Sequence, residues 1–269
     1  ETTNECGLDI DSLEFNIYPS PEIALTEKDS ICIGNQVQIS PSVSNGSPTY
    51  FYNWAPDSSG LSTISTPNPI ANPSITTQYS LTVTDIYSCQ DVDSITIEVL
   101  PLPFVNAGLD DSTCYLDTAF LNGTVSGGIA PYGFSWSPMN VLSVDTILNP
   151  FFVIDNDYSF YLTSTDDFGC VNSDTVEIDI ISLPFVDAGV DTSLCDQPIP
   201  VTFVGQPTGG VWSGNGITSG GVFTPNGVSM YTLNYEYTDP STGCYNYDSI
   251  EVDVVPPDLA NAGLDSSVC

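Results

Sequence analysis

The residues best suited to covalent chemistry are eight cysteines, because the chain has no histidine and only one basic residue, Lys28. No pair of cysteines has the Cys-x-x-Cys spacing of zinc sites and redox motifs. Widely spaced cysteines without histidine predict disulfides, which form in oxidising compartments. Serine–histidine and cysteine–histidine catalysis both need the missing histidine. We therefore expect a disulfide-bonded protein that is not an enzyme.

The spacing of the cysteines reveals an internal repeat. Short gaps between consecutive cysteines alternate with gaps that are about twice as long. Such alternation is typical of a tandem array, here with a period of about 75 to 80 residues. The cysteines are Cys6, Cys32, Cys89, Cys114, Cys170, Cys195, Cys244 and Cys269.

Two disulfide pairings fit this repeat. The first pairs cysteines within a repeat, because a β-sandwich brings its first and penultimate strands together. It would join Cys32 to Cys89, Cys114 to Cys170 and Cys195 to Cys244, and each closed loop would stabilise by about 4 kcal/mol in the chain-entropy model. The alternative pairs neighbours across the short gaps, such as Cys89 with Cys114, and so staples one repeat to the next. We favour pairing within repeats, with Cys6 and Cys269 bonded to residues outside this chain.

The segments that must position these cysteines have the pattern of strands. In "YSLTVTD" the residues Tyr79, Leu81 and Val83 alternate with polar ones, and "DSITIEV" and "DSIEVDV" alternate in the same way. Period-two alternation predicts strands with one buried face. No helical period occurs, and a tryptophan in the middle of each repeat is expected in the core. The fold class is therefore all-β, a tandem array of β-sandwiches of the seven-strand class.

The repeat also predicts the domain boundaries. The final phrase "NAGLDSSVC" repeats "NAGLDDSTC" and "DAGVDTSLC", so we interpret the chain as a window from a longer array. The third repeat has the smallest separation between its two cysteines, so it should be shorter between its first cysteine and Trp212, with short strands centred on Trp212 and Phe223. The predicted parts are 1–19, the end of a preceding repeat; 20–102, 103–184 and 185–257, three complete repeats; and 258–269, the first strand of a following repeat.

Several stretches carry a family resemblance. "DAGVDTSLC", "YNWAPDSSGLS" and "GGVWSGNGITSGGVFTPNG" resemble the PKD-like and immunoglobulin-like tandem repeats of large surface proteins in Bacteroidetes-type bacteria. That group includes gliding-motility adhesins exported by type IX secretion. The resemblance implies an extracellular location on a bacterial cell surface and a role in adhesion. The chain lacks the "WDFGDG" stretch of PKD domains.

Charge narrows the range of partners. The chain has 34 acidic residues and a net charge of −33, which repels nucleic acid and anionic lipid. No apolar run approaches the length of a membrane span, which is about 18 residues or more. Acidic and amide residues recur where repeats join, at Asn106, Asp110, Asp187, Asp191, Asn261 and Asp265. They suit either a calcium ion between domains or the capping of local turns, and we favour turns and no cofactor.

A second recurrent motif is Asp followed by Ser or Thr and an aliphatic residue. One interpretation is a turn-forming aspartate at a strand entry. The other is an O-glycan acceptor, since the motif resembles the one glycosylated in exported Bacteroidetes proteins. Both stay open for Ser12, Ser94, Thr175 and Ser249.

The favoured function is a structural stalk segment of a long adhesin or surface filament. Its partners would be neighbouring repeats, other filament subunits or glycans. The alternative is a binding module that holds glycan or protein through exposed aromatic residues such as Tyr50, Tyr132 and Tyr245.

Overall fold

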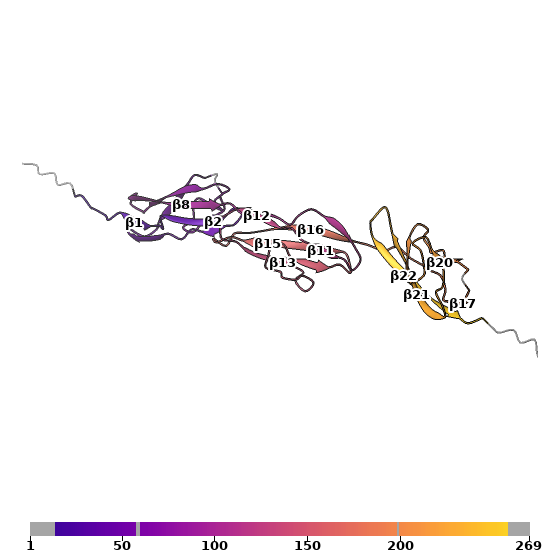
Figure 1. Ribbon diagram of the computed structural model, residues 1–269. Helices are drawn as coiled ribbons and strands as arrows, with labels where there is room; N and C mark the ends of the chain where they lie inside the picture. The colour runs from indigo at the N-terminus through magenta and orange to yellow at the C-terminus, as the bar shows by residue number, and fades with distance from the viewer. Residues whose placement is uncertain (1–13, 58–59, 198, 258–269) are drawn as a thin grey trace, which may run out of the picture. The chain divides into compact units, whose positions relative to one another are not determined.

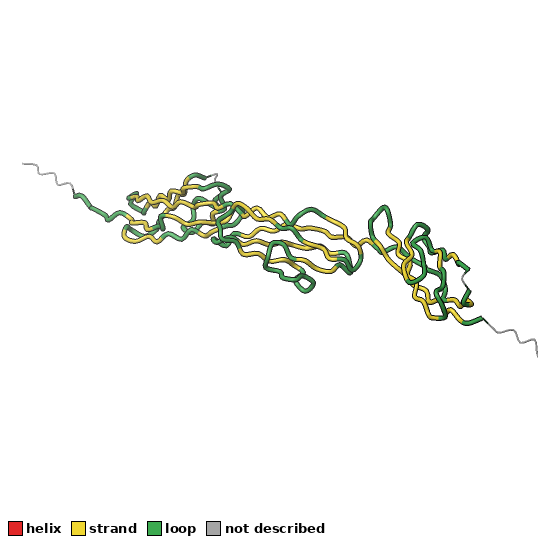
Figure 2. The backbone as a smooth tube through the Cα atoms, in the orientation of Figure 1, coloured by secondary structure: helices red, strands yellow, loops and turns green. Residues whose placement is uncertain are grey.

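The computed structural model describes residues 14–57, 60–197 and 199–257. Figure 2 shows only strands and loops over these residues. The all-β fold class is confirmed, and no helix long and apolar enough to cross a membrane occurs in the described part of the chain. Cys6, Ser12, Cys269 and the predicted segment 258–269 lie outside the described residues. Residues 14–20 are described and form no strand.

Three four-stranded sheets follow one another along the chain, and corresponding strands take the same places in each. Figure 1 labels strands from all three sets. The first sheet has the order β2-β8-β7-β5, and the pairs β1-β4 and β3-β6 complete its sandwich. Its strands are β1 (Pro21–Ala24), β2 (Lys28–Cys32), β3 (Val37–Gln38), β4 (Ser42–Asn45), β5 (Phe51–Ala55), β6 (Ile70–Ala71), β7 (Thr77–Thr84) and β8 (Gln90–Leu100).

The second set of strands repeats this arrangement. Its four-stranded sheet has the order β10-β16-β15-β13, with the pairs β12-β9 and β11-β14. The strands are β9 (Pro103–Asn106), β10 (Asp111–Cys114), β11 (Thr118–Phe120), β12 (Thr124–Gly127), β13 (Gly133–Ser137), β14 (Phe151–Val153), β15 (Tyr158–Thr165) and β16 (Val171–Ile181).

The third set has fewer paired strands in its first part than the other two. Its sheet has the order β17-β22-β21-β19, and one further pair, β18-β20, accompanies it. A single bridge from Asp187 to Gln206 stands where the first two sandwiches have the pairs β1-β4 and β9-β12. The strands around Trp212 and Phe223 are short, while the shorter third repeat as a separate domain subtype stays a prediction. The strands are β17 (Thr192–Cys195), β18 (Val201–Thr202), β19 (Val211–Gly214), β20 (Val222–Phe223), β21 (Ser229–Thr238) and β22 (Tyr245–Val255).

The alternating residues form the cores, as the sequence pattern predicts. In β7, Tyr79, Leu81 and Val83 are fully buried while the residues between them are only half-buried. The tryptophans Trp54 and Trp136 are also buried, and their indole N–H groups donate to the carbonyls of Thr66 and Ile147. Trp212 packs against Tyr235 with ring centroids 5.0 Å apart. The tryptophans therefore serve the core.

The described chain forms two compact units, and the second set of strands contributes to both. One unit holds the chain up to Asn106 with Thr124–Ser135 and Thr163–Asp174. The other holds Ala107–Gly123, Trp136–Leu162 and the chain from Thr175 onward. The predicted repeat boundaries after residues 102 and 184 stay predictions. Between β8 and β9 only residues 101 and 102 lie outside a strand.

Candidate functional site

The first cysteine of each repeat ends a short strand that runs parallel to the last strand of its sandwich. Cys32 lies opposite Leu100, Cys114 opposite Ile181 and Cys195 opposite Val255. The residue after each cysteine donates its N–H to the carbonyl of the same partner, at 2.9, 2.9 and 2.8 Å. Each of these cysteines is therefore fixed at the end where its sandwich's last strand finishes.

The second cysteine of each repeat lies at the opposite end, in the turn before the last strand. Cys89, Cys170 and Cys244 immediately precede β8, β16 and β22. An aspartate shapes this turn: Oδ1 of Asp85 accepts the N–H of Cys89 at 2.9 Å, and Oδ1 of Asp166 accepts that of Cys170 at 2.8 Å. Both aspartates are buried. Sequence reasoning missed them, although Thr-Asp a few residues before each second cysteine is a visible signal.

The turn aspartate Asp166 is held as a carboxylate by the backbone around it. Burial by itself raises the pKa of Asp166, but the N–H groups of Ile129, Cys170, Phe168 and Gly169 outweigh burial and lower it below the usual range. As a carboxylate, Asp166 accepts hydrogen bonds from the backbone N–H groups of the turn that holds Cys170, and so stabilises that turn.

The predicted pairing within repeats is wrong, and strand length explains why. Cys89 immediately precedes β8 and Cys32 lies beside the end of that strand, so about 11 residues of extended chain, roughly 35 Å, separate them. A disulfide needs Cα atoms only about 4.4 to 6.8 Å apart. The alternative link between Cys89 and Cys114 is also absent. The sequence already indicated this separation, because the alternating pattern of the last strand begins directly after each second cysteine.

The structure instead joins the first cysteine of one repeat to the second cysteine of the next. Cys32 bonds Cys170 with a Cα–Cα distance of 5.5 Å, and Cys114 bonds Cys244 at 5.6 Å. Each disulfide lies within one of the two compact units. Among the described cysteines, Cys89 and Cys195 are left as free thiols, so the prediction that all six lie in disulfides within this chain is also corrected.

The first disulfide is buried. Cys32 and Cys170 are buried and form an apolar cluster with Leu100, and Leu102 packs against it. Nearby, the side-chain amide of Asn172 donates to the carbonyl of Pro103 at 2.9 Å, which ties the chain entering the second sandwich to the start of β16. The short connection and the cluster together enclose this bond.

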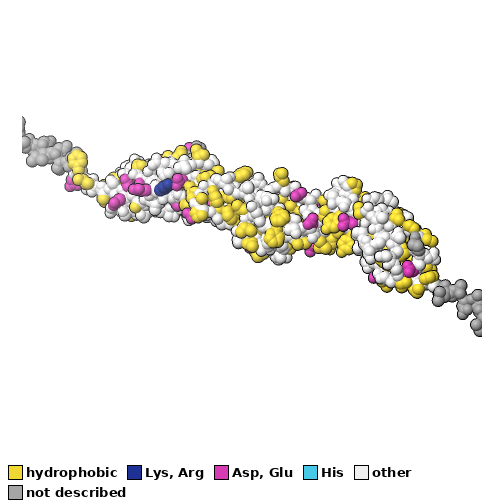
Figure 3. All heavy atoms as spheres, in the orientation of Figure 1, with side chains coloured by type: hydrophobic (Ala, Val, Ile, Leu, Met, Phe, Trp, Pro, Cys, Tyr) yellow, Lys and Arg dark blue, Asp and Glu magenta, His cyan; other side chains and the backbone are white. Residues whose placement is uncertain are grey.

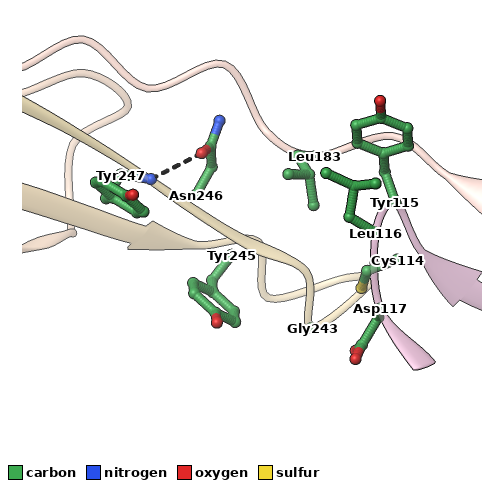
Figure 4. A pocket seen from close by; sticks show the side chains of 9 residues that line it. All are labelled: Cys114, Tyr115, Leu116, Asp117, Leu183, Gly243, Tyr245, Asn246 and Tyr247. Atoms are coloured by element: carbon green, nitrogen blue, oxygen red, sulfur yellow. Dashed lines mark hydrogen bonds between the residues drawn. The ribbon is translucent and has the colours of Figure 1, made fainter. Parts of the chain in front are cut away.

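The second disulfide lies beside a pocket of about 360 Å³ (Figure 4). Cys244 is buried, whereas Cys114 is only half-buried. The same tie recurs here, since the side-chain amide of Asn246 donates to the carbonyl of Pro184 at 3.0 Å. The lining residues are Cys114, Tyr115, Leu116, Asp117, Leu183, Gly243, Tyr245, Asn246 and Tyr247.

The acidic residues weighed for calcium accept backbone hydrogen bonds. Oδ1 of Asp110 accepts the N–H of Glu177 at 2.9 Å, and Oδ1 of Asp191 accepts that of Glu251 at 2.8 Å. Asp187 accepts the N–H of Gly189, whose φ of +101° favours glycine. The described residues contain no cluster of three or more metal-ligating side chains. Asp110 and Asp191 thus hold residues that are distant in the sequence, a longer-range task than turn capping, whereas the bond of Asp187 caps a local turn. Asn261 and Asp265, the other residues of this pattern, lie outside the described residues.

The described candidate glycan acceptors, Ser94, Thr175 and Ser249, lie inside strands β8, β16 and β22. The aspartate before Ser94 and the one before Ser249 each hold the backbone of a segment distant in the sequence. Oδ2 of Asp93 accepts the N–H of Leu25, and Oδ2 of Asp248 accepts that of Ala188, both at 2.9 Å. The aspartate is therefore not the turn former expected at a strand entry. Thr175 and Ser249 are exposed, while Ser94 is half-buried. Glycosylation of these hydroxyls stays a prediction.

The aromatic residues considered for ligand binding differ in setting. The hydroxyl groups of Tyr50 and Tyr132 donate to the carbonyls of Asn45 and Gly127, so both brace loops of their own sandwiches. Tyr245 is 60% exposed beside the pocket of Figure 4. Of the three, only Tyr245 has a face open to a ligand. The one basic side chain, Lys28, pairs with Glu98 at 2.6 Å, in keeping with the mainly acidic charged surface in Figure 3.

Comparisons with known proteins give distant structural likeness alone. No protein-family model and no curated protein matches this chain. The N-terminal eight immunoglobulin domains of Down syndrome cell adhesion molecule match with a TM-score of 0.48 and 14% identity, over 89% of this chain and 37% of that one. A titin I-band fragment matches with a TM-score of 0.41 and 10% identity, over 89% and 100%. Sidekick-1 immunoglobulin domains 1–5 match at 0.31 and 14%, over 88% and 59%.

Proposed function

We propose that this chain is a load-bearing, non-enzymatic stalk segment of a long extracellular adhesin or surface filament. The observation that carries the proposal is the overlap of its two disulfide loops. One loop spans Cys32 to Cys170 and the other Cys114 to Cys244, with sequence separations of 138 and 130 residues. Residues 114–170 belong to both loops, so both disulfides constrain this stretch of the chain.

Overlapping loops limit how far the chain extends under tension. A pull applied before Cys32 and after Cys244 passes through the first disulfide to Cys170, back along the chain to Cys114, and through the second disulfide. At about 3.6 Å per residue, this shortest covalent path is roughly 200 Å long when fully extended. The unlinked chain over the same interval would reach roughly 760 Å. The disulfides would thus hold the segment short even if a sandwich unfolds.

The setting of the stalk is proposed from chemistry and from resemblance. Disulfides persist in oxidising surroundings such as the outside of a cell, and a net charge of −33 keeps a surface soluble. The resemblance of the quoted stretches to gliding-motility adhesins supports a bacterial cell surface and export by type IX secretion.

Single-molecule stretching between handles placed before Cys32 and after Cys244 tests the proposal. Under oxidising conditions we expect extension of this interval to stop at roughly 200 Å. A reductant should raise the limit to roughly 760 Å. The Cys89→Ser/Cys195→Ser variant, which retains both disulfides, is the matched control and should behave like the original chain. Equal extension with and without reductant would reject the load-bearing role.

A second candidate function rests on the pocket in Figure 4. Tyr245 and Tyr247 are 60% and 66% exposed beside it, and Tyr115 lines the other side. Exposed aromatic rings offer stacking faces to sugars. A glycan array with the intact chain and with Tyr245→Ser tests this function: binding that the substitution removes would support a glycan-binding module.

A further inference from the structure

Two described cysteines, Cys89 and Cys195, are free thiols. Each occupies a position in its sandwich that is equivalent to that of a cysteine in a formed disulfide. Cys195 ends β17 opposite Val255, as Cys32 ends β2 opposite Leu100. Cys89 occupies the aspartate-held turn before β8, as Cys170 does before β16. Each formed disulfide joins the first cysteine of one repeat to the second cysteine of the next. The two free thiols are likewise one first cysteine, Cys195, and one second cysteine, Cys89.

The surface around Cys195 is mostly apolar, with Gln197 as the one polar side chain among the described residues that line the pocket there. Cys195 is exposed and lines a pocket of about 170 Å³ with Leu194, Val201 and Pro225. Ile199 also lines the pocket and is 62% exposed. In the formed junction, Cys32 lies in an apolar cluster with Leu100 and Leu102. Apolar side chains thus lie beside the free first cysteine as they do beside Cys32, although they come from other positions of the sandwich.

We propose that the Cys195 end of this chain is a covalent docking face for the Cys89 turn of a second copy. The contact would be heterologous, because the two faces differ, and such contacts propagate head to tail. The inference rests on the proposed function in one respect, because both suppose that β-sandwiches of this kind join end to end. It names the partner surface, a turn in which a buried aspartate presents a cysteine.

The bond would form by thiol–disulfide exchange with glutathione disulfide as oxidant. The Cys89 thiolate attacks glutathione disulfide, forms a mixed disulfide and releases one glutathione. The Cys195 thiolate then attacks the Cys89 sulfur, forms the protein disulfide and releases the second glutathione. Two protein thiols are oxidised, and one glutathione disulfide is reduced to two thiols.

Two complementary variants test the docking. Both carry Cys6→Ser and Cys269→Ser; one adds Cys89→Ser and so presents Cys195, and the other adds Cys195→Ser and so presents Cys89. Neither change touches a formed disulfide. After mixing in a glutathione buffer, non-reducing mass spectrometry should find at least tenfold more of the Cys89–Cys195 dimer than of either symmetric dimer. A statistical ratio of 1:2:1, or no dimer, would overturn the proposal.

A further substitution separates docking from simple thiol reactivity. Ile199→Asp in the variant that presents Cys195 places a charge in the pocket but leaves the thiol exposed. We expect the mixed dimer to fall at least fivefold while the rate of alkylation by iodoacetamide stays unchanged. An unchanged dimer yield would show that the pocket has no part and would overturn the docking face. Stretching of the single chain depends only on the internal disulfides, so it tests the proposed function independently.

Discussion

The two disulfide junctions share one covalent plan but differ in what encloses them. At the first, both cysteines are buried and packed with Leu100 and Leu102. At the second, Cys114 is half-buried beside an open pocket of about 360 Å³. The loops are nearly equal in length, with separations of 138 and 130 residues. Comparing the two junctions separates the contribution of a disulfide to the free energy of unfolding from that of the side chains packed around it.

Loss of either cross-link should have the largest effect and an almost equal one. Cys32→Ala/Cys170→Ala and Cys114→Ala/Cys244→Ala each release a loop worth about 5 kcal/mol in the chain-entropy model. Urea unfolding of both variants, followed by tryptophan fluorescence, measures the losses. A difference of more than about 2 kcal/mol would mean that packing rather than loop closure dominates.

Reduction should distinguish the junctions more clearly. Thiol–disulfide exchange requires access to sulfur, so the Cys114–Cys244 bond should be reduced roughly tenfold faster than the Cys32–Cys170 bond. Timed dithiothreitol treatment, alkylation and peptide mass spectrometry give both rates in one sample. Equal rates would show that the apolar cluster does not protect the first bond.

Truncation of one leucine at each junction should sharpen the contrast. Leu102→Ala removes apolar contacts from the cluster around the first disulfide and should cost about 1–2 kcal/mol of unfolding free energy. Leu183→Ala at the open pocket should cost about 0.5 kcal/mol or less. Denaturant midpoints provide the measurement, with each leucine variant serving as the control for the other.

The smallest expected difference lies in the two turns that carry the second cysteines. Asp166 is buried and accepts several backbone N–H groups, whereas the pKa of Asp239 is lowered mainly by the hydroxyl and N–H of Ser241. Asp166→Asn should lower the thermal midpoint by roughly 2–4 °C, and Asp239→Asn by less.

The effect of Asp166 should also depend on pH in a defined direction. Its folded-state pKa is lowered, so its contribution is present above the ordinary aspartate pKa and is lost as pH falls through the folded value. Thermal midpoints of the original chain and of Asp166→Asn should therefore converge in acid. A difference that persists at a pH well below the ordinary aspartate range would contradict this role of the charge.

Local patterns in the sequence were enough to predict the fold class and the strand faces. Alternation at Tyr79, Leu81 and Val83 determines which side of β7 is buried, because side chains along a strand point to opposite faces. The buried positions of Trp54 and Trp136 follow from the same preference of large apolar groups for the core. These features depend on neighbours along the chain, which the sequence displays directly.

Disulfide partners and the tasks of the aspartates were decided by tertiary structure alone. The spacing of the cysteines predicts disulfides and the repeat, but not the end of the sandwich at which each cysteine lies. That position depends on the parallel register of β2 with β8, which places Cys32 beside Leu100 and far from Cys89. Likewise, Asp110 meets the N–H of Glu177 only after strands distant in sequence are brought together. A covalent bond or hydrogen bond forms between neighbours in space, and the sequence order of these residues does not specify those neighbours.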